Sequence, residues 1–221
     1  IRGSEGSDVY PAFGKRLKEL MPDQLITFHP FGRTASSQWF HQEDWLDINM
    51  FQSGHRRYDQ ASLGEWDDNA VKEEFFGEDN WRYVDRDRGM VPAKPTLDGE
   101  PSYEQIPQGL HDPGQPYWQA CDVRRYAYWS VFQGAAGHTY GDHAVQQCYT
   151  GGTNGNSGVK QVWQDAIHHE GSGQLRHLKE LMLSVDFPGG RPAQEFLLSG
   201  QKEKYERISV FAGKDYIFCY D

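Results

Sequence analysis

Polar side chains follow each of four short apolar runs in this 221-residue sequence, at the point where each run ends. Because ligands of parallel α/β folds lie at the carboxyl ends of the strands, we expect these side chains to meet at one rim. Imidazoles, amides and phenols suit a polyhydroxylated ligand, and a carboxylate there can also break a glycosidic bond. The candidate residues are His29, Arg33, Gln52, His55, Asp98, Glu100, Tyr103, His138 and Tyr140.

Glu100 is the strongest candidate for a catalytic role. Strand alternation places it on one face with Asp98, and Glu100 is the outer of the two, at the mouth of the third run. Asp98 lies one step deeper and is more typical of a residue that orients a neighbour. The alternative is that Glu100 is an ordinary loop carboxylate, paired with Arg33, Arg124 or Arg125.

Two histidines and a tyrosine are expected beside Glu100. Alternation along the fourth run puts His138 and Tyr140 on its inner face, and His29 should join them, so that all four side chains reach a common cavity. They would bind hydroxyl groups or tune Glu100. Each of the three, taken alone, is more often a structural residue.

Other kinds of chemistry have weaker signals in the sequence. We expect no metal and no cofactor: His168 and His169 are adjacent on a predicted helix, so their rings diverge, and no HExxH motif occurs. His138 and His143 flank Asp142, which leaves an ion site there as a minor alternative. No GxSxG elbow or phosphate-binding glycine loop is present.

The elements that must position these residues alternate between strand and helix. Alternation of this kind predicts an α/β fold in which helices cover a parallel sheet. Beyond residue 190 the pattern changes to two strands around residues 212–215, which predicts an antiparallel hairpin that begins a β-domain. Strands are expected at 25–28, 46–51, 94–98 and 135–140, and helices at 10–20, 81–88, 122–131 and 163–182, the last broken near 171–173.

Composition excludes several function classes. The charge of 22 − 32 = −10 argues against nucleic acid and acidic membrane surfaces as partners. We expect no membrane span and no intact leader, since no apolar window is long enough. Three widely spaced cysteines exclude a disulfide framework. Aromatic residues form 14 % of the chain, which suits both core packing and stacking on sugar rings.

Five blocks of sequence, in this order, resemble the apiosidase-like glycoside hydrolases of family 140, which are often labelled endoglucanases or family 5 hydrolases. The blocks span residues 29–34 (HPFGRT), 51–58 (FQSGHRRY), 94–101 (KPTLDGEP), 122–132 and 137–141. The resemblance runs from about Leu25 to Leu198. Five blocks in the family's order are far more specific than any one of them.

The resemblance implies a fold and a division of the chain. The family is similar to a clan of retaining enzymes built on a (β/α)8 TIM barrel, in which the DGEP block ends the seventh strand. Residues 1–190 would then be the C-terminal half of the barrel, strands five to eight, and residues 191–221 the start of a small antiparallel β-sandwich. The acid/base Asp of the family precedes the segment that residues 1–3 resemble, so we expect it upstream of this chain.

The resemblance also implies a function. Glu100 would be the nucleophile of a retaining hydrolase that cleaves O-glycosidic bonds in plant polysaccharide side chains, as an apiosidase or an endoglucanase. The expected partners are an oligosaccharide or polysaccharide and the N-terminal half of the barrel, and the expected location is secreted, periplasmic or cell-surface. These residues alone should be inactive. The alternative is a non-catalytic carbohydrate-binding or scaffold protein with a degenerate site, which the intact DGEP block disfavours.

Overall fold

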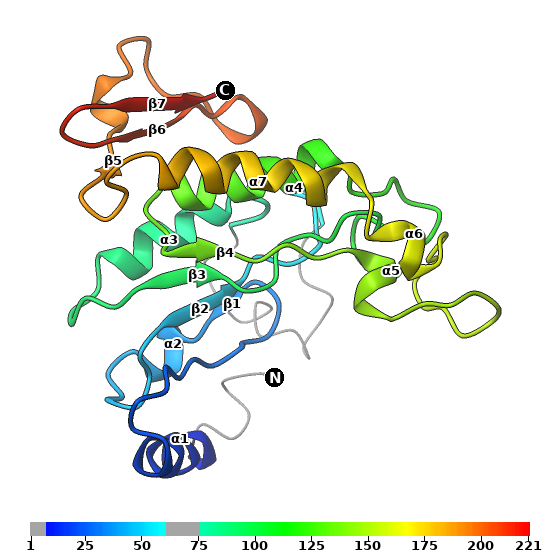
Figure 1. The fold of residues 1–221 in the computed structure, drawn as a ribbon, viewed down its shortest axis with the longest axis horizontal. Coiled ribbons are helices and arrows are strands. Elements are labelled where there is room, and N and C mark those ends of the chain that lie inside the picture. The colour runs from blue at the N-terminus through cyan, green and yellow to red at the C-terminus, as the bar shows by residue number, and fades with distance from the viewer. Residues whose placement is uncertain (1–7, 61–75) are drawn as a thin grey trace.

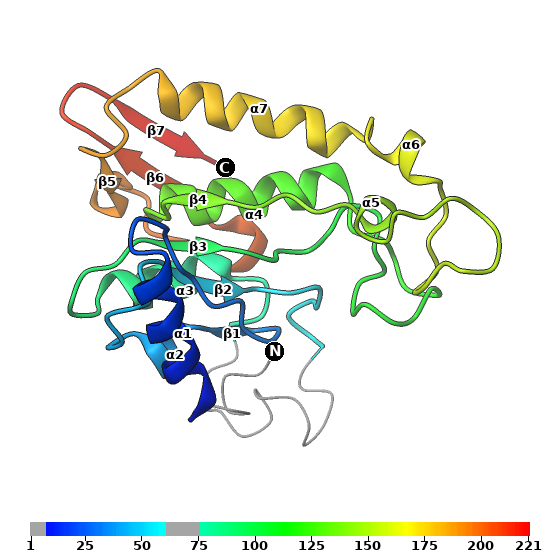
Figure 2. The ribbon, with the colours of Figure 1, turned by 60° about the horizontal axis from the view of Figure 1, so that its bottom comes forward.

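The computed structural model describes residues 8–60 and 76–221, so residues 1–3 of the family resemblance lie outside it. Helices and short strands alternate through the first 190 residues, and a small three-stranded sheet follows (Figures 1 and 2). The elements are α1 Val9–Leu20, β1 Thr34–Ala35, α2 Ser37–Phe40, β2 Asn49–Gln52, α3 Asn80–Arg88, β3 Thr96–Asp98, α4 Ala120–Phe132, β4 Gly137–His138, α5 His143–Gln146, α6 Trp163–Ala166, α7 Glu170–Leu183, β5 Arg191–Pro192, the 3-10 turns η1 Gln194–Phe196 and η2 Lys204–Glu206, β6 Ser209–Ala212 and β7 Ile217–Tyr220.

The central sheet has the strand order β1-β2-β3-β4, in which β2, β3 and β4 are parallel. Met50 pairs with Leu97, and Asp98 pairs with His138, so the carboxyl ends of these strands lie side by side. Helices α3 and α4 pack against β3 and β4 and against each other. The mixed α/β fold with parallel strands agrees with the sequence-based expectation, whereas closure into a barrel stays a prediction.

The prediction of a strand at residues 25–28 is wrong, because the structure has only one isolated bridge there. Thr27 makes a single parallel bridge to Ile48, and the neighbour of β2 on that side is instead the antiparallel β1. The backbone N–H of Ile26 donates to the carboxylate of Asp47 at 2.7 Å. The Ile26 N–H thus binds a side chain instead of the backbone of a neighbouring strand, and residues 25–28 do not form a longer set of strand hydrogen bonds.

The predicted break near residues 171–173 is also misplaced. Residues 167–169 separate α6 from α7, and α7 runs through both glycines. A Cβ on Gly171 would overlap the side chain of Glu104 and lie 2.7 Å from Val123 Cγ2. Gly171 therefore permits the close approach of α7 to its neighbours instead of ending the helix.

The C-terminal hairpin is confirmed, and it packs on the helices. Strands β6 and β7 pair antiparallel, with β5 added on the other side of β6. The ring of Phe211 in β6 is buried in one cluster with Phe132 of α4 and with Leu178 and Met182 of α7. This part of residues 191–221 therefore shares a core with the helices before it. The start of a separate β-sandwich at residue 191 stays a prediction.

None of the helices within residues 8–60 and 76–221 is long and apolar enough to cross a membrane.

Candidate active site

Glu100 lies just beyond the end of β3, between two histidines. His55 Nε2 is 3.1 Å from Glu100 Oε1, and His29 Nε2 is 3.3 Å from Glu100 Oε2. The Glu100 side chain is 22 % exposed, so it can still meet a ligand. Its backbone carbonyl accepts from the N–H of Gly54 at 3.0 Å, which fixes the loop after β3 to the loop after β2. The sequence-based grouping of Glu100 with His29 and His55 is thus seen in the structure.

The contacts of His55 define which ring nitrogen carries its proton. Its Nδ1 faces the backbone N–H of Tyr103 at 3.3 Å and therefore accepts. A neutral ring then carries its proton on Nε2 and donates it to Glu100. The ring also packs edge-on against Tyr103, with centroids 4.6 Å apart, and its backbone carbonyl accepts from the indole of Trp118 at 3.0 Å. Both ring nitrogens, the ring and the backbone carbonyl of His55 therefore all have contacts that fix its position.

These contacts set the charge of Glu100. Burial raises its pKa, but the hydrogen bond from His55 and the nearby His55 and His29 rings lower it more, so the net pKa is below the ordinary value. Burial and the neighbouring Glu100 carboxylate raise the pKa of the Tyr103 phenol. At neutral pH the site therefore presents a carboxylate beside a phenol that keeps its proton.

Asp98 is fully buried and cannot touch a substrate, contrary to its place among the predicted binding residues. Its carboxylate accepts from Ser53 Oγ at 2.6 Å and from Asn80 Nδ2 at 3.1 Å. It also accepts from the backbone N–H of Glu100, and burial raises its pKa to about 7. Strand β3 ends at Asp98, two residues before Glu100. Asp98 holds the two loops of the site together.

Glu100 lines a cavity of about 380 Å³, which lies within the size range of ligand pockets. A second cavity, also of about 380 Å³, does not include Glu100 but shares the lining residues Gln52, His55 and Leu110 with the first. A larger cavity of about 530 Å³ lies elsewhere and does not include Glu100. The Glu100 cavity is lined by Gln52, His55, Glu100, Tyr103, Ile106, Leu110, His143, Gln146, Gln147, Asn154, Asn156 and Ser157, and the adjoining one by Phe31, Gly32, Arg33, Gln52, Gly54, His55, Arg56, Leu110 and His111.

Comparison with known families assigns the chain that carries this site to a family. The family described as "Apiosidase-like, catalytic domain" matches residues 1–188. The chain belongs to the apiosidase-like family. None of the curated proteins compared with it matches.

Two solved structures resemble this apiosidase-like chain over 99 % of its length, each with a TM-score of 0.93. One is described as a glycoside hydrolase and is 45 % identical. The other is a glycoside hydrolase family 5 protein from Bacteroides vulgatus ATCC 8482 and is 42 % identical. The match covers 48 % and 47 % of those chains, so this chain spans about half their length.

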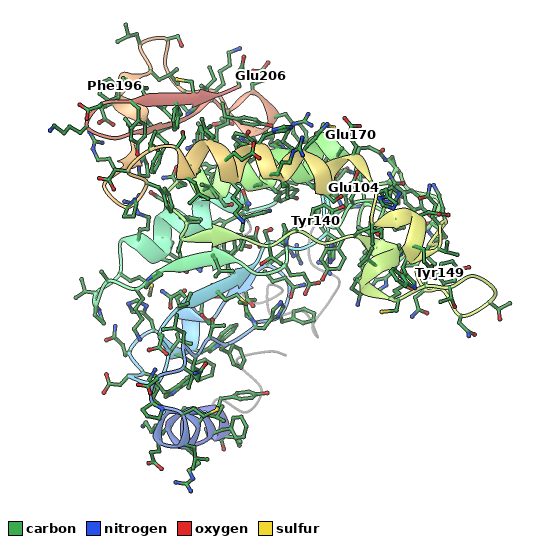
Figure 3. All side chains as sticks on the ribbon, viewed as in Figure 1. Glu104, Tyr140, Tyr149, Glu170, Phe196 and Glu206 are labelled. Carbon is green, nitrogen blue, oxygen red and sulfur yellow. The ribbon has the colours of Figure 1, made fainter. Side chains whose placement is uncertain are left out.

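Two predicted residues of the apiosidase-like site lie away from Glu100. The His138 ring faces α4, where its Nδ1 is 3.0 Å from Ser130 Oγ, and burial lowers its pKa to about 3. The phenol of Tyr140 donates to Glu104 at 2.7 Å (Figure 3). The four-residue cavity predicted from alternation is therefore wrong for these two. Strand β4 ends at His138, so a period of two does not fix the direction of the Tyr140 side chain beyond it.

Two of the arginines that the sequence offered as partners of Glu100 in the apiosidase-like site, Arg124 and Arg125, bind other side chains. Among the described residues that line the two cavities, Glu100 is the only carboxylate. Arg125 pairs with Glu78 and Asp122, at 3.1 and 3.0 Å, and Arg124 donates to the side chain of Gln174. The Glu100 carboxylate contacts the rings of His55 and His29 and accepts a hydrogen bond from the phenol of Tyr103. In the described ranges no group of three His, Cys, Asp or Glu is placed to hold a metal ion.

Sequence reasoning missed one wall of the Glu100 cavity. This wall is formed by α5 and by the residues that follow it, which bring His143, Gln147, Asn154 and Asn156 to the cavity. The signal was present in the glycine- and asparagine-rich run at 151–158, which resembles an ordinary connecting loop. Its amides became functional candidates only when the fold placed them in the same cavity as Glu100.

Proposed function

We propose that this chain supplies the nucleophile of a retaining glycoside hydrolase that cleaves O-glycosidic bonds in plant polysaccharide side chains. The observation that carries the proposal is Glu100, a partly exposed carboxylate with a lowered pKa, held by His55 and His29 in a cavity at the carboxyl ends of parallel strands. A nucleophile must be ionised and fixed in place before it can attack. Membership of the apiosidase-like family supports the same reaction class.

In this reaction an oxygen of Glu100 attacks the anomeric carbon as the leaving oxygen takes a proton from a second carboxylic acid. The ester that forms between Glu100 and the sugar is then opened by water, which gives its proton to the same second carboxylate. Retention needs the two carboxyl groups about 5 to 5.5 Å apart. We propose that an Asp upstream of residue 1 supplies the second group, in line with relatives of twice this length.

Replacing Glu100 tests the assignment directly. Glu100→Gln in the full-length enzyme keeps the size and polarity of the side chain but removes the nucleophile, so turnover of apiose-containing pectin fragments and aryl glycosides should fall at least a thousandfold while binding is largely kept. Azide or formate should restore cleavage of an activated aryl glycoside by Glu100→Ala. Activity of Glu100→Gln within about threefold of the wild type would rule out Glu100 as the nucleophile.

A second candidate is a carbohydrate-binding or scaffold protein without catalysis. The observation in its favour is that Glu100 is the only carboxylate among the described residues of the two cavities. The same experiment separates the two functions, because a binding protein would retain pectin fragments without releasing products. In the hydrolase we propose, the substrate is extracellular, which places the enzyme outside the cytoplasm, at the cell surface, in the periplasm or in the medium.

A further inference from the structure

The residues after β4 form a second wall of the Glu100 cavity. Helix α5 and the run that follows it overhang the end of the sheet toward which β4 points (Figures 1 and 2). Gln146 and Gln147 at the end of α5, with Asn154 and Asn156 beyond it, line the same cavity as Glu100. Four amide side chains therefore face the same space as the nucleophile.

Side chains of α5 and its flanking residues hold the backbone of this wall. Gln147 Oε1 accepts from the backbone N–H of Asn156 at 2.8 Å. His143 Nε2 lies 3.1 Å from the carbonyl oxygen of Asn156 and 3.2 Å from that of Ser157, so this nitrogen carries a proton and donates. The Asn156 backbone is thus fixed on both sides.

Two phenols fix the ends of the same run. Tyr149 donates to the carbonyl oxygen of Gly152 at 2.9 Å, and Tyr117 donates to that of Gly158 at 2.8 Å. Gly158 has a φ of +67°, which glycine adopts without strain. The run is therefore a preorganised loop, and a ligand that binds it does not have to order the backbone first.

The amides at the tip of the wall are free to bind. Gln146, Asn154 and Asn156 are exposed, and within residues 8–60 and 76–221 none of their side-chain amides has a hydrogen-bond partner. An amide offers donors and an acceptor together, which matches the paired donor and acceptor character of a sugar hydroxyl. The fixed backbone and the free amides together indicate a ligand-binding wall.

The wall carries no charge in its described residues. Its lining consists of amides, a serine and His143, and burial lowers the pKa of His143, which keeps that ring neutral. A sugar with a carboxylate group would be expected to meet Arg or Lys instead. The wall therefore fits a neutral, hydroxyl-rich ligand.

We propose that Asn154 and Asn156 form a subsite for a neutral sugar residue next to the one attacked by Glu100. This inference rests on the proposed glycosidase function and adds to it a preference for substrates that extend beyond a single sugar. Hydrogen bonds from preorganised amides favour the longer substrate because little conformational freedom is lost on binding.

The test compares a short and an extended substrate in the full-length enzyme. The short one is 4-nitrophenyl apioside, and the extended one is a neutral, apiose-containing pectin oligosaccharide of two to four sugars. In Asn154→Ala/Asn156→Ala, kcat/KM for the oligosaccharide should fall about tenfold more than that for the aryl glycoside, equal to about 1.4 kcal/mol. Thr153→Ala, an exposed change in the same run outside the cavity lining, is the matched control and should keep the ratio.

Each other outcome is decisive. An equal loss on both substrates, or no loss on either, would overturn the subsite. An enzyme that hydrolyses neither substrate would contradict the proposed function instead, and calorimetric titration of the same oligosaccharide would then decide the subsite separately. In that titration, binding weakened at least fivefold by the double substitution supports the subsite, and unweakened binding refutes it.

Discussion

The two histidines at Glu100 make different contacts. The His55 side chain is 5 % exposed and its Nδ1 accepts from Tyr103, so its Nε2 proton points at Glu100. The His29 side chain is 45 % exposed, and its Nδ1 lies 3.1 Å from the carbonyl oxygen of Pro30. The two ring nitrogens of His29 thus face two oxygen atoms, the carbonyl oxygen of Pro30 and a carboxylate oxygen of Glu100. His55 is therefore the buried donor to Glu100, and His29 is its exposed neighbour.

This difference predicts the pH dependence of the enzyme. Glu100 must be ionised to attack, and its pKa is lowered by the hydrogen bond from His55. Removing that donor in His55→Ala raises the pKa of Glu100, so the acid limb of kcat/KM should move to higher pH. His29→Ala should move it less, and His177→Ala, an exposed change on α7, should not move it. A pH–rate profile measures all three, and an acid limb of His55→Ala at or below the wild-type pH would contradict the assignment.

Individual residues show where sequence reasoning succeeds. Gln52 is the last residue of β2, His55 follows it, and Glu100 and Tyr103 follow β3. The structure brings all four to one cavity because parallel strands end at one edge. This part depends on strand order alone. Asp98 is the last residue of β3 and is buried, and its hydrogen bonds to Ser53 and Asn80 give it the orienting role that the sequence also indicated, in place of a contact with substrate.

At the scale of elements, glycines explain a further error in the sequence-based reading. A glycine inside a helical pattern predicts a break when only propensity is considered. Gly171 and Gly173 instead lie in the first turns of α7, and their surroundings differ completely. A Cβ on Gly171 would overlap Glu104, whereas one on Gly173 would meet nothing within 4 Å. Such packing is a property of the neighbouring elements, which local sequence does not contain.

The two glycines therefore predict opposite mutational effects. Gly173→Ala should stabilise the full-length protein by about 0.5 to 1 kcal/mol, because alanine loses less backbone entropy in a helix. Gly171→Ala should destabilise it by about 1 to 3 kcal/mol, because the new methyl group displaces Glu104 or shifts α7. Urea denaturation of both variants measures the free energy of unfolding. Equal effects of the same sign would show that the contact of Gly171 with Glu104 does not constrain the helix.

At the scale of the whole molecule, apolar surface is left open at one edge of the sheet. Within the described residues β4 pairs only with β3, and a cavity of about 280 Å³ lies beside it. Leu178, Met182, Leu183 and Phe187 line this cavity, and Leu183 is 72 % exposed. An unpaired strand next to exposed apolar side chains is a surface that pairs readily with another chain.

We therefore expect residues 1–221, expressed alone, to self-associate or to melt without cooperativity, and to lack glycosidase activity. Pairing β4 and covering the neighbouring cavity both require residues that these elements do not supply. Catalysis requires a second carboxylate, and Glu100 is the only one among the described residues of its two cavities. Sedimentation velocity, a thermal melt and hydrolysis of an aryl glycoside test the three expectations, with the full-length enzyme as the control. A cooperatively melting monomer that hydrolyses the glycoside would contradict this expectation. It would show that these 221 residues themselves cover the edge of β4 and its apolar cavity and supply the second carboxylate.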